Sequence, residues 1–362
     1  MNPPTTPPSR PRLLVVDDAT DLLALIAKVL KQDGYDVVTA EDAGEALTLA
    51  ATTPQPDLIL LDIEMPGASG FDVCRVLKGD PATADIPVIF LTGRTEPGEQ
   101  LEGLDLGAVD YLTKPINSKL LRARVRIHLA LANRRIELER LVEERTRQLE
   151  NTRLQVIRRL GRAMEYHESS AVGNRVARVA QYAKLIAEAA GAKPHICELM
   201  LNAAPLYDIG KLGVPAEVLR KPGTLSAPDW ERVRRHPELG AEIIGEHDDP
   251  MLNLARMLAL THHECWDGSG YPGGLKEAAI PWPGRVMAIV DTFEAMTTTQ
   301  FHRDPLSIEE AAAAIEDAAG SKFDPDLIGP FKKALPAMRE VRAKLSDSLG
   351  DMINLDFSMP SR

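Results

Sequence analysis

Short apolar runs alternate with amphipathic segments over residues 12–126. The runs rich in Val, Ile and Leu are Leu13–Val16, Val37–Thr39, Leu58–Leu61 and Val88–Leu91, with a weaker fifth at Tyr111–Leu112. This alternation predicts βαβ units, and therefore a doubly wound, five-stranded parallel sheet of the α/β class. In open sheets of this kind, ligands bind beyond the carboxyl ends of the strands.

A different pattern follows the predicted sheet. From about Ser118 to Met164 there is no proline, and Gly161 is the single glycine. Apolar residues recur at steps of seven or four, at Leu131, Leu138, Val142, Leu149, Val156 and Leu160. This spacing predicts a helical coiled-coil linker over residues 127–160 and favours a parallel homodimer. Arg145, Thr152 and Arg159 interrupt the apolar stripe, which leaves its register open.

Composition narrows the class of protein. A chain of 362 residues has room for two or three domains, and its net charge of −11 argues against a broad DNA-binding face. The arginines of the linker are better explained as a solvated coil face than as a nucleic-acid patch. The three cysteines have no paired spacing, which indicates free thiols in a reducing cytoplasm. No apolar run approaches the ~18 residues of a membrane span. Residues 1–11 are expected to be a disordered segment that leads into the first domain.

Polar residues fall where the predicted strands end. Asp17 and Asp18 follow the first strand, Asp62 the third, Thr92 the fourth and Lys114 the fifth. This pattern resembles the receiver domain of two-component response regulators, over residues 12–126. The resemblance implies an α/β fold of the CheY-like type and a sensor histidine kinase as partner.

The resemblance also implies a role for each of these residues. Asp62 is expected to be the phosphoacceptor, and Asp17, Asp18 and Asp62 to hold Mg²⁺, which offsets their crowded negative charge. Lys114 and Thr92 are expected to contact the phosphoryl group, and Tyr111 to act as the switch aromatic.

The second half of the chain carries a run of residues suited to metal binding. Two adjacent histidines, His262 and His263, precede a Gly-rich turn that ends in Gly270-Tyr271-Pro272. Further potential ligands are Asp208, His236 and Asp291. With the segments "DIGKLGVPAEVLRKPGTL", "RRHPELGAEII" and "IPWPGRVMAIVDTFEAM", residues 161–335 resemble the HD-GYP family, all-α phosphohydrolases that cleave cyclic di-GMP with bound metal ions. Residues 336–362 are expected to be a C-terminal tail.

From this resemblance follows a set of expected site residues. Asp208, His236, His262 and His263 suffice for one Fe, Mn or Zn ion, and a second ion would keep only Asp208, as a bridge, and Asp291. Asp208, Lys211 and Asp291 are the expected catalytic residues. Substrate contacts are expected from Lys211, Arg285, Arg303 and the turn Gly270, Tyr271 and Pro272.

Two positions depart from the family pattern. Tyr207 stands where relatives carry the histidine of the His-Asp pair, and Arg175 falls where another ligand histidine is expected. A phenol binds metal weakly unless it is ionised, and a guanidinium repels a nearby ion. One ion is therefore expected, although two are possible.

Two functions compete on this basis. The first is a phosphorylation-controlled cyclic di-GMP phosphodiesterase that tolerates Tyr207. The second is a signalling module with weak or lost activity, which binds metal, nucleotide or a partner such as a GGDEF cyclase. The altered ligands favour the second modestly, since metal sites depend on complete shells. A DNA-binding regulator is disfavoured because no helix-turn-helix signature or basic face is present.

Overall fold

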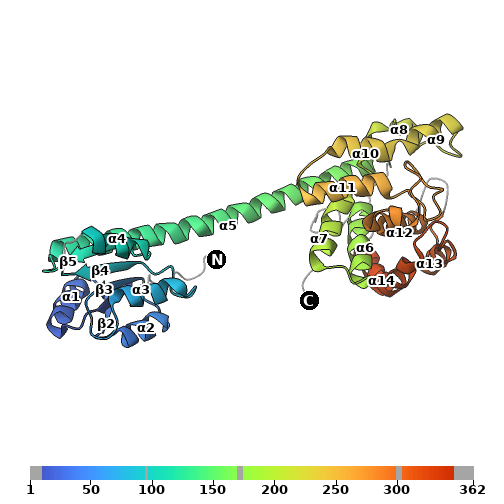
Figure 1. The fold of residues 1–362 in the computed structure, drawn as a ribbon. Coiled ribbons are helices and arrows are strands. Elements are labelled where there is room, and N and C mark those ends of the chain that lie inside the picture. Colours follow the sequence, from blue (N-terminus) through green and yellow to red (C-terminus); the bar gives the residue numbers. More distant parts are fainter. Residues whose placement is uncertain (1–9, 94–96, 169–173, 299–303, 346–362) are drawn as a thin grey trace. The chain divides into compact units, whose positions relative to one another are not determined.

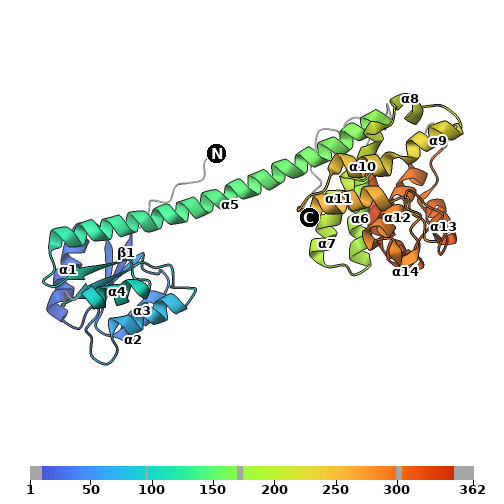
Figure 2. The same cartoon turned by 45° about the horizontal axis from the view of Figure 1, so that its top comes forward.

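The computed structural model describes residues 10–93, 97–168, 174–298 and 304–345. The chain divides between Thr146 and Arg147 into two compact units. The first unit is built on a parallel sheet, and the second is formed by helices (Figures 1 and 2).

The first unit contains the five strands that the sequence predicts. They are β1 (Arg12–Val16), β2 (Asp36–Ala40), β3 (Leu58–Asp62), β4 (Val88–Thr92) and β5 (Asp110–Thr113). All neighbours pair in parallel, in the order β2-β1-β3-β4-β5. The connecting helices are α1 (Thr20–Gln32), α2 (Ala43–Ala51), α3 (Gly70–Gly79) and α4 (Pro97–Asp105), and α5 (Ser118–Glu168) follows β5. The doubly wound parallel sheet is confirmed.

Alternate residues of each strand face opposite sides of this sheet. Leu13 and Val15 pack with α1 and the start of α5, whereas Leu14 and Val16 pack with α2 and α3. Because both faces are covered, the strands are continuous apolar runs, and polar side chains are confined to the strand ends.

Helix α5 is a single helix of 51 residues (Figure 1). It begins after Asn117, whose side-chain oxygen accepts hydrogen bonds from the backbone N–H groups of Lys119 (3.0 Å) and Leu120 (3.2 Å). It extends beyond the predicted linker at both ends. Within each chain the predicted coiled-coil residues are exposed, for example Leu131 at 59% and Leu149 at 71%.

The second unit packs short helices around one apolar core. They are α6 (Arg175–Ala189), α7 (Pro194–Ala203), η1 (Ala204–Leu206), η2 (Ile209–Gly213), α8 (Ala216–Leu219), α9 (Ala227–Arg234), α10 (His236–Ile244), α11 (Pro250–Thr261), η3 (Glu277–Ala279), α12 (Trp282–Thr297), α13 (Ile308–Asp317) and α14 (Pro325–Lys344). The core draws residues from α6, α7, α11, α12 and α14 and from the end of α5. The all-helical second domain is therefore confirmed.

Two glycines allow the elements that carry the polar residues to approach closely. A Cβ on Gly210 would lie 1.9 Å from the carbonyl oxygen of His236, and one on Gly284 would lie 2.2 Å from Oγ1 of Thr261. No other residue fits at these contacts without backbone movement. Gly210 thereby brings η2 onto α10, and Gly284 brings α12 onto the end of α11.

Among the described residues, no helix is both long enough and apolar enough to cross a membrane.

Candidate metal centres

The first candidate site lies at the carboxyl edge of the sheet. Asp17 follows β1, Asp62 ends β3, and both side chains are buried, whereas Asp18 is exposed. One carboxylate oxygen from each of these three residues lies within 4.8 Å of the others. Lys114 Nζ lies 2.7 Å from Asp17 Oδ2 and 2.9 Å from Asp62 Oδ2. The sequence expectation that Asp17, Asp18, Asp62 and Lys114 come together matches this arrangement.

The chemistry of this edge suits a hard divalent cation. Asp62 Oδ1 is buried and has no hydrogen-bond partner among the described residues. Burial raises the pKa of Asp62, with Asp17 adding to the effect and Lys114 opposing it. A Mg²⁺ ion would satisfy the free oxygen and offset the repulsion between the carboxylates. Thr92 lies buried at the end of β4, and Tyr111 is half-buried on β5.

The second candidate site collects four side chains from three places in the sequence. Asp208 precedes η2, His236 begins α10, and His262 and His263 follow α11. One ligand atom from each lies within 4.8 Å of the others. The four residues expected to hold a transition metal are therefore adjacent in the fold.

Hydrogen bonds to backbone carbonyls fix two of these rings for metal binding. His236 Nδ1 lies 2.6 Å from the carbonyl oxygen of Val233, and His262 Nδ1 lies 2.9 Å from that of Leu258. A carbonyl oxygen only accepts, so each Nδ1 carries a proton, and in the neutral form of the ring each Nε2 has a lone pair that can bind a metal ion.

The Nε2 atoms of these two rings lie close to one another and to a carboxylate. The two Nε2 atoms are 3.2 Å apart, and they lie 3.3 and 3.4 Å from Asp208 Oδ1. Three acceptors this close repel each other unless a cation lies between them. The nitrogen-rich donor set fits a divalent Fe, Mn or Zn ion.

His263 supplies the fourth donor and is held by the following turn. Its ring stacks on Tyr271 with centroids 4.7 Å apart, and burial next to His262 holds its pKa far below the ordinary value, so the ring is neutral. Gly270 is required here, because a Cβ would lie 2.3 Å from the backbone nitrogen of Cys265. Glu264, to which the sequence assigned no role, accepts hydrogen bonds from the backbone of Gly273 (2.7 Å) and Leu275 (2.9 Å).

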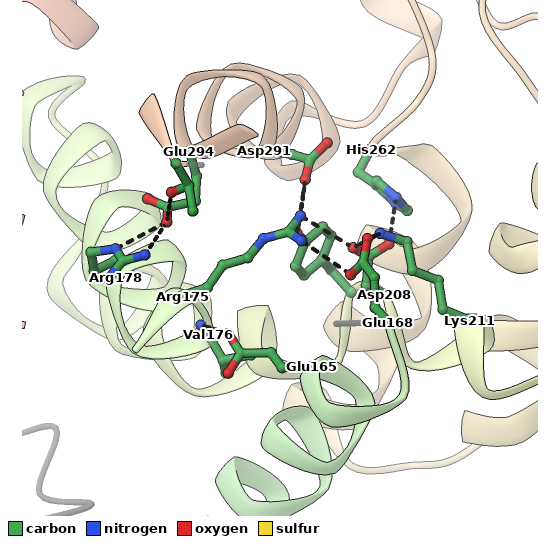
Figure 3. A network of polar contacts seen from close by, with 12 residues as sticks. Glu165, Glu168, Arg175, Val176, Arg178, Asp208, Lys211, His262, Asp291 and Glu294 are labelled. Carbon is green, nitrogen blue, oxygen red and sulfur yellow. Dashed lines mark hydrogen bonds and ion pairs between the residues drawn. The ribbon is translucent and has the colours of Figure 1, made fainter. Parts of the chain in front are cut away.

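Next to these four residues lies an extended network of charged residues centred on Arg175 (Figure 3). Its Nη2 donates to the hydroxyl oxygen of Tyr207 at 3.0 Å, and lies 3.3 Å from Asp291 Oδ1 and 3.7 Å from Asp208 Oδ2. Its Nη1 lies 3.1 Å from Glu168 Oε2. The guanidinium is thus surrounded by three carboxylates and a phenol.

The two substituted positions of the family pattern are therefore in direct contact. Burial raises the pKa of Tyr207 well above its ordinary value, with Arg175 opposing and Asp208 reinforcing the shift. The phenol stays protonated and donates to Asp291 Oδ1 at 2.7 Å. Asp291, expected as a metal ligand, lies beside Arg175 and outside the group of four converging ligands.

Lys211 completes the network. Its Nζ lies 2.7 Å from Asp208 Oδ2 and 2.9 Å from Glu168 Oε1. Burial opposes its charge, but Asp208 and Glu168 raise the pKa of Lys211 overall, so it remains a cation. The sequence interpretation missed Glu168, and its place at the end of a long, charged linker helix offered no signal.

Arg285, a further expected substrate contact, interacts with residues outside this network. Arg285 Nη1 lies 2.7 Å from Asp324 Oδ2, and its guanidinium lies over the ring of Trp266. Arg303 lies outside the described residues. His167 Nε2 lies 2.8 Å from the carbonyl oxygen of Val214.

Comparison with known proteins identifies both units. Residues 13–126 match the response regulator receiver domain, and residues 163–327 match the HD domain. A Vibrio cholerae protein named "Probable cyclic di-GMP phosphodiesterase" is 36% identical, over 94% of this chain and 81% of its own length. A "Cyclic di-GMP phosphodiesterase" of Thermotoga maritima is 31% identical, over 92% of this chain and 93% of its own. The "Cyclic di-GMP phosphodiesterase response regulator RpfG" of Xanthomonas campestris is 29% identical, over 92% and 90%.

The fold, the acidic edge of the sheet and the histidine cluster together define a response regulator with a receiver domain and an HD-type output domain. Since similarity to such proteins spans both domains, the chain belongs to the HD-GYP family of response regulators.

Proposed function

We propose that this protein is a phosphorylation-controlled response regulator whose output domain holds one transition-metal ion and has weak or lost activity on cyclic di-GMP. One observation carries the proposal: the guanidinium of Arg175 lies between Asp208 and Asp291, the two carboxylates expected to bind a second ion.

A two-metal hydrolase needs ions about 3.5–4 Å apart to clamp the attacking and leaving oxygens. Arg175 places a positive charge near the expected position of the second ion. A guanidinium is not a Lewis acid, however, so it cannot bind and activate water as a metal ion does. Tyr207 holds its proton and binds Asp291, so it does not replace a lost histidine.

The four remaining donors define what this site can do. When bound, an ion held by Asp208, His236, His262 and His263 would supply Lewis acidity at a phosphoryl oxygen. Lys211 is placed to bind a phosphate oxygen only if it exchanges one of its carboxylate partners, Asp208 or Glu168. The stacked His263–Tyr271 pair would form one wall for a nucleotide ligand.

In the receiver, Asp62 is proposed to accept a phosphoryl group from a sensor histidine kinase, with Mg²⁺ held by Asp17, Asp18 and Asp62. Lys114, Thr92 and Tyr111 are proposed to respond to the phosphoryl group. The exposed apolar stripe of α5, which includes Leu131 and Leu149, is proposed to pair with a second copy in a parallel coiled coil. A GGDEF cyclase is a further candidate partner.

The second candidate function is an active cyclic di-GMP phosphodiesterase. It is favoured by the names of the relatives and by the complete Gly270-Tyr271-Pro272 turn. In that case Arg285 and Arg303 would remain candidate substrate contacts.

The two functions are separated by one experiment. Anaerobically purified protein is analysed for metal by mass spectrometry, then incubated with cyclic di-GMP and Mn²⁺ and resolved by anion exchange. We expect about one ion per output domain and intact messenger, at the level of a His262→Ala control. Two ions with linear dinucleotide or GMP well above that control would establish the phosphodiesterase instead.

A further inference from the structure

The last residue of α5, Glu168, contacts both basic residues of the metal centre. Oε1 lies 2.9 Å from Lys211 Nζ, and Oε2 lies 3.1 Å from Arg175 Nη1 (Figure 3). The same two cations bind Asp208, at 2.7 and 3.7 Å. One carboxylate from α5 thus fixes the two cations that flank the metal-binding aspartate.

The end of α5 is itself fixed against the segments that carry the site. A Cβ on Gly161 would lie 2.4 Å from the carbonyl oxygen of Pro205, so α5 runs directly against η1, just before Tyr207 and Asp208. His167 Nε2 lies 2.8 Å from the carbonyl oxygen of Val214, which follows η2. Arg220 Nε donates to the carbonyl oxygen of His167 at 3.1 Å.

A second acidic residue of α5 binds the helix that carries Arg175. Glu165, one turn before Glu168, accepts a hydrogen bond of 2.6 Å from the backbone N–H of Val176 in the first turn of α6. The backbone from which the Arg175 side chain extends is therefore tied to α5 as well.

The formal charges show why Glu168 matters to a metal ion. Glu168, Asp208 and Asp291 carry three negative charges, and Arg175 and Lys211 carry two positive ones. The net charge of these five side chains is therefore −1, that is, one negative charge in excess. A neutral residue at position 168 would remove that excess and release two cations beside the ligand Asp208.

We propose that Glu168 is the positioning residue of the metal centre, and that the end of α5 regulates the centre by holding Arg175 and Lys211 in place. This inference rests on the proposed single-ion site. Helix α5 begins at Ser118, four residues after Lys114, and ends at Glu168.

The test is a set of Mn²⁺ affinities measured on the full-length protein by isothermal titration calorimetry. We expect Glu168→Gln to weaken binding at the output domain about tenfold or more, in the range seen for residues that support metal ligands. The double variant Glu168→Gln/Arg175→Met again has one excess negative charge, so its affinity should return to within about threefold of the wild type.

Glu165→Gln is the matched control. It makes the same chemical change one turn earlier on α5, and its amide oxygen can still accept the Val176 N–H, so we expect less than a twofold change in affinity. The receiver site is identical in all variants, so differences between them report on the output domain.

The outcomes separate this inference from the proposed function. Wild-type affinity in Glu168→Gln would overturn the inference, and so would a double variant that binds no more tightly than Glu168→Gln, since that indicates a structural role alone. The number of ions bound by the wild type tests the proposed function independently. Two ions there would refute the single-ion site, whether or not Glu168→Gln changes the affinity.

Discussion

Among individual residues, Arg175 has the largest consequence for the chemistry of the output domain. The half-buried cation lies among three carboxylates, two of which were expected to bind metal. Arg175 and Tyr207 also contact one another at 3.0 Å and share Asp291. They therefore act as a unit, and replacing only one of them leaves the other still bound to Asp291.

We predict that the double variant Tyr207→His/Arg175→His regains a second metal position. Two neutral imidazoles would replace a cation and a protonated phenol, leaving Asp208 and Asp291 free for a second ion. Metal content should rise from about one to about two ions per output domain, and hydrolysis of cyclic di-GMP should rise at least tenfold. Mass spectrometry and anion exchange measure the two effects.

Either single variant serves as the control and should bind close to one ion. Unchanged metal stoichiometry in the double variant would mean that these positions are not the lost ligands.

At the scale of the elements, the contact between α5 and α6 depends on a buried carboxyl group. Glu165 is 5% exposed and accepts the backbone N–H of Val176. Burial raises its pKa from 4.5 to about 7, although Arg175 and the Val176 N–H oppose the shift. The folded chain therefore binds this proton more tightly than the unfolded chain.

The stability that Glu165 contributes should depend on pH. This contribution is fully present below about pH 4.5, decreases as the pH rises, and is lost once the pH has passed about 7. Because Gln stays neutral, Glu165→Gln should match the wild type at pH 4.5 and exceed it at pH 8, by up to about 3 kcal/mol. Urea denaturation of the output domain at several pH values measures the difference.

An exposed residue of the same helix, Glu150, provides the comparison. Glu150→Gln should leave the pH dependence unchanged. A constant difference between Glu165→Gln and the wild type at all pH values would contradict the role of burial.

Sequence patterns predicted the sheet well because both of its faces are buried. Runs such as Leu13–Val16 and Leu58–Leu61 have no polar residue, and the residues at their ends mark the acidic edge. The grouping of Asp208, His236, His262 and His263 as a candidate metal site was also predictable, since these four residues are present although Tyr207 replaces the histidine next to Asp208.

The network around Arg175 could not be predicted in the same way. Its partner Glu168 is the last residue of α5, a helix with many Glu and Arg residues, most of them exposed, and nothing in its spacing distinguishes it. Arg285 was expected near substrate, yet it pairs with Asp324, a contact that arises from tertiary packing of α12 and α14. Long-range ion pairs of this kind have no periodic signature.

On the scale of the whole molecule, the two units have separate apolar cores. Two clusters cover the faces of the receiver sheet, and a third fills the output domain. Each unit contains its own candidate metal site. Ligands of one site should therefore stabilise mainly the unit that contains it.

We predict two transitions in calorimetric unfolding of the full-length chain. Chelation of transition metals should lower the melting temperature of one transition, and Mg²⁺ with beryllofluoride should raise that of the other. Asp62→Asn should abolish the second response and leave the first intact. A single transition that responds to both treatments would show that the units unfold together.

The unbroken course of α5 also limits how its length can change. Each residue of an α-helix advances the direction of a side chain by about 100°, so two added residues turn everything beyond them by about 200°. Seven added residues bring the orientation back to within about 20°. Homologues with longer or shorter connecting helices should therefore differ by multiples of seven residues, which keep both the apolar stripe and the direction of Glu168 in phase.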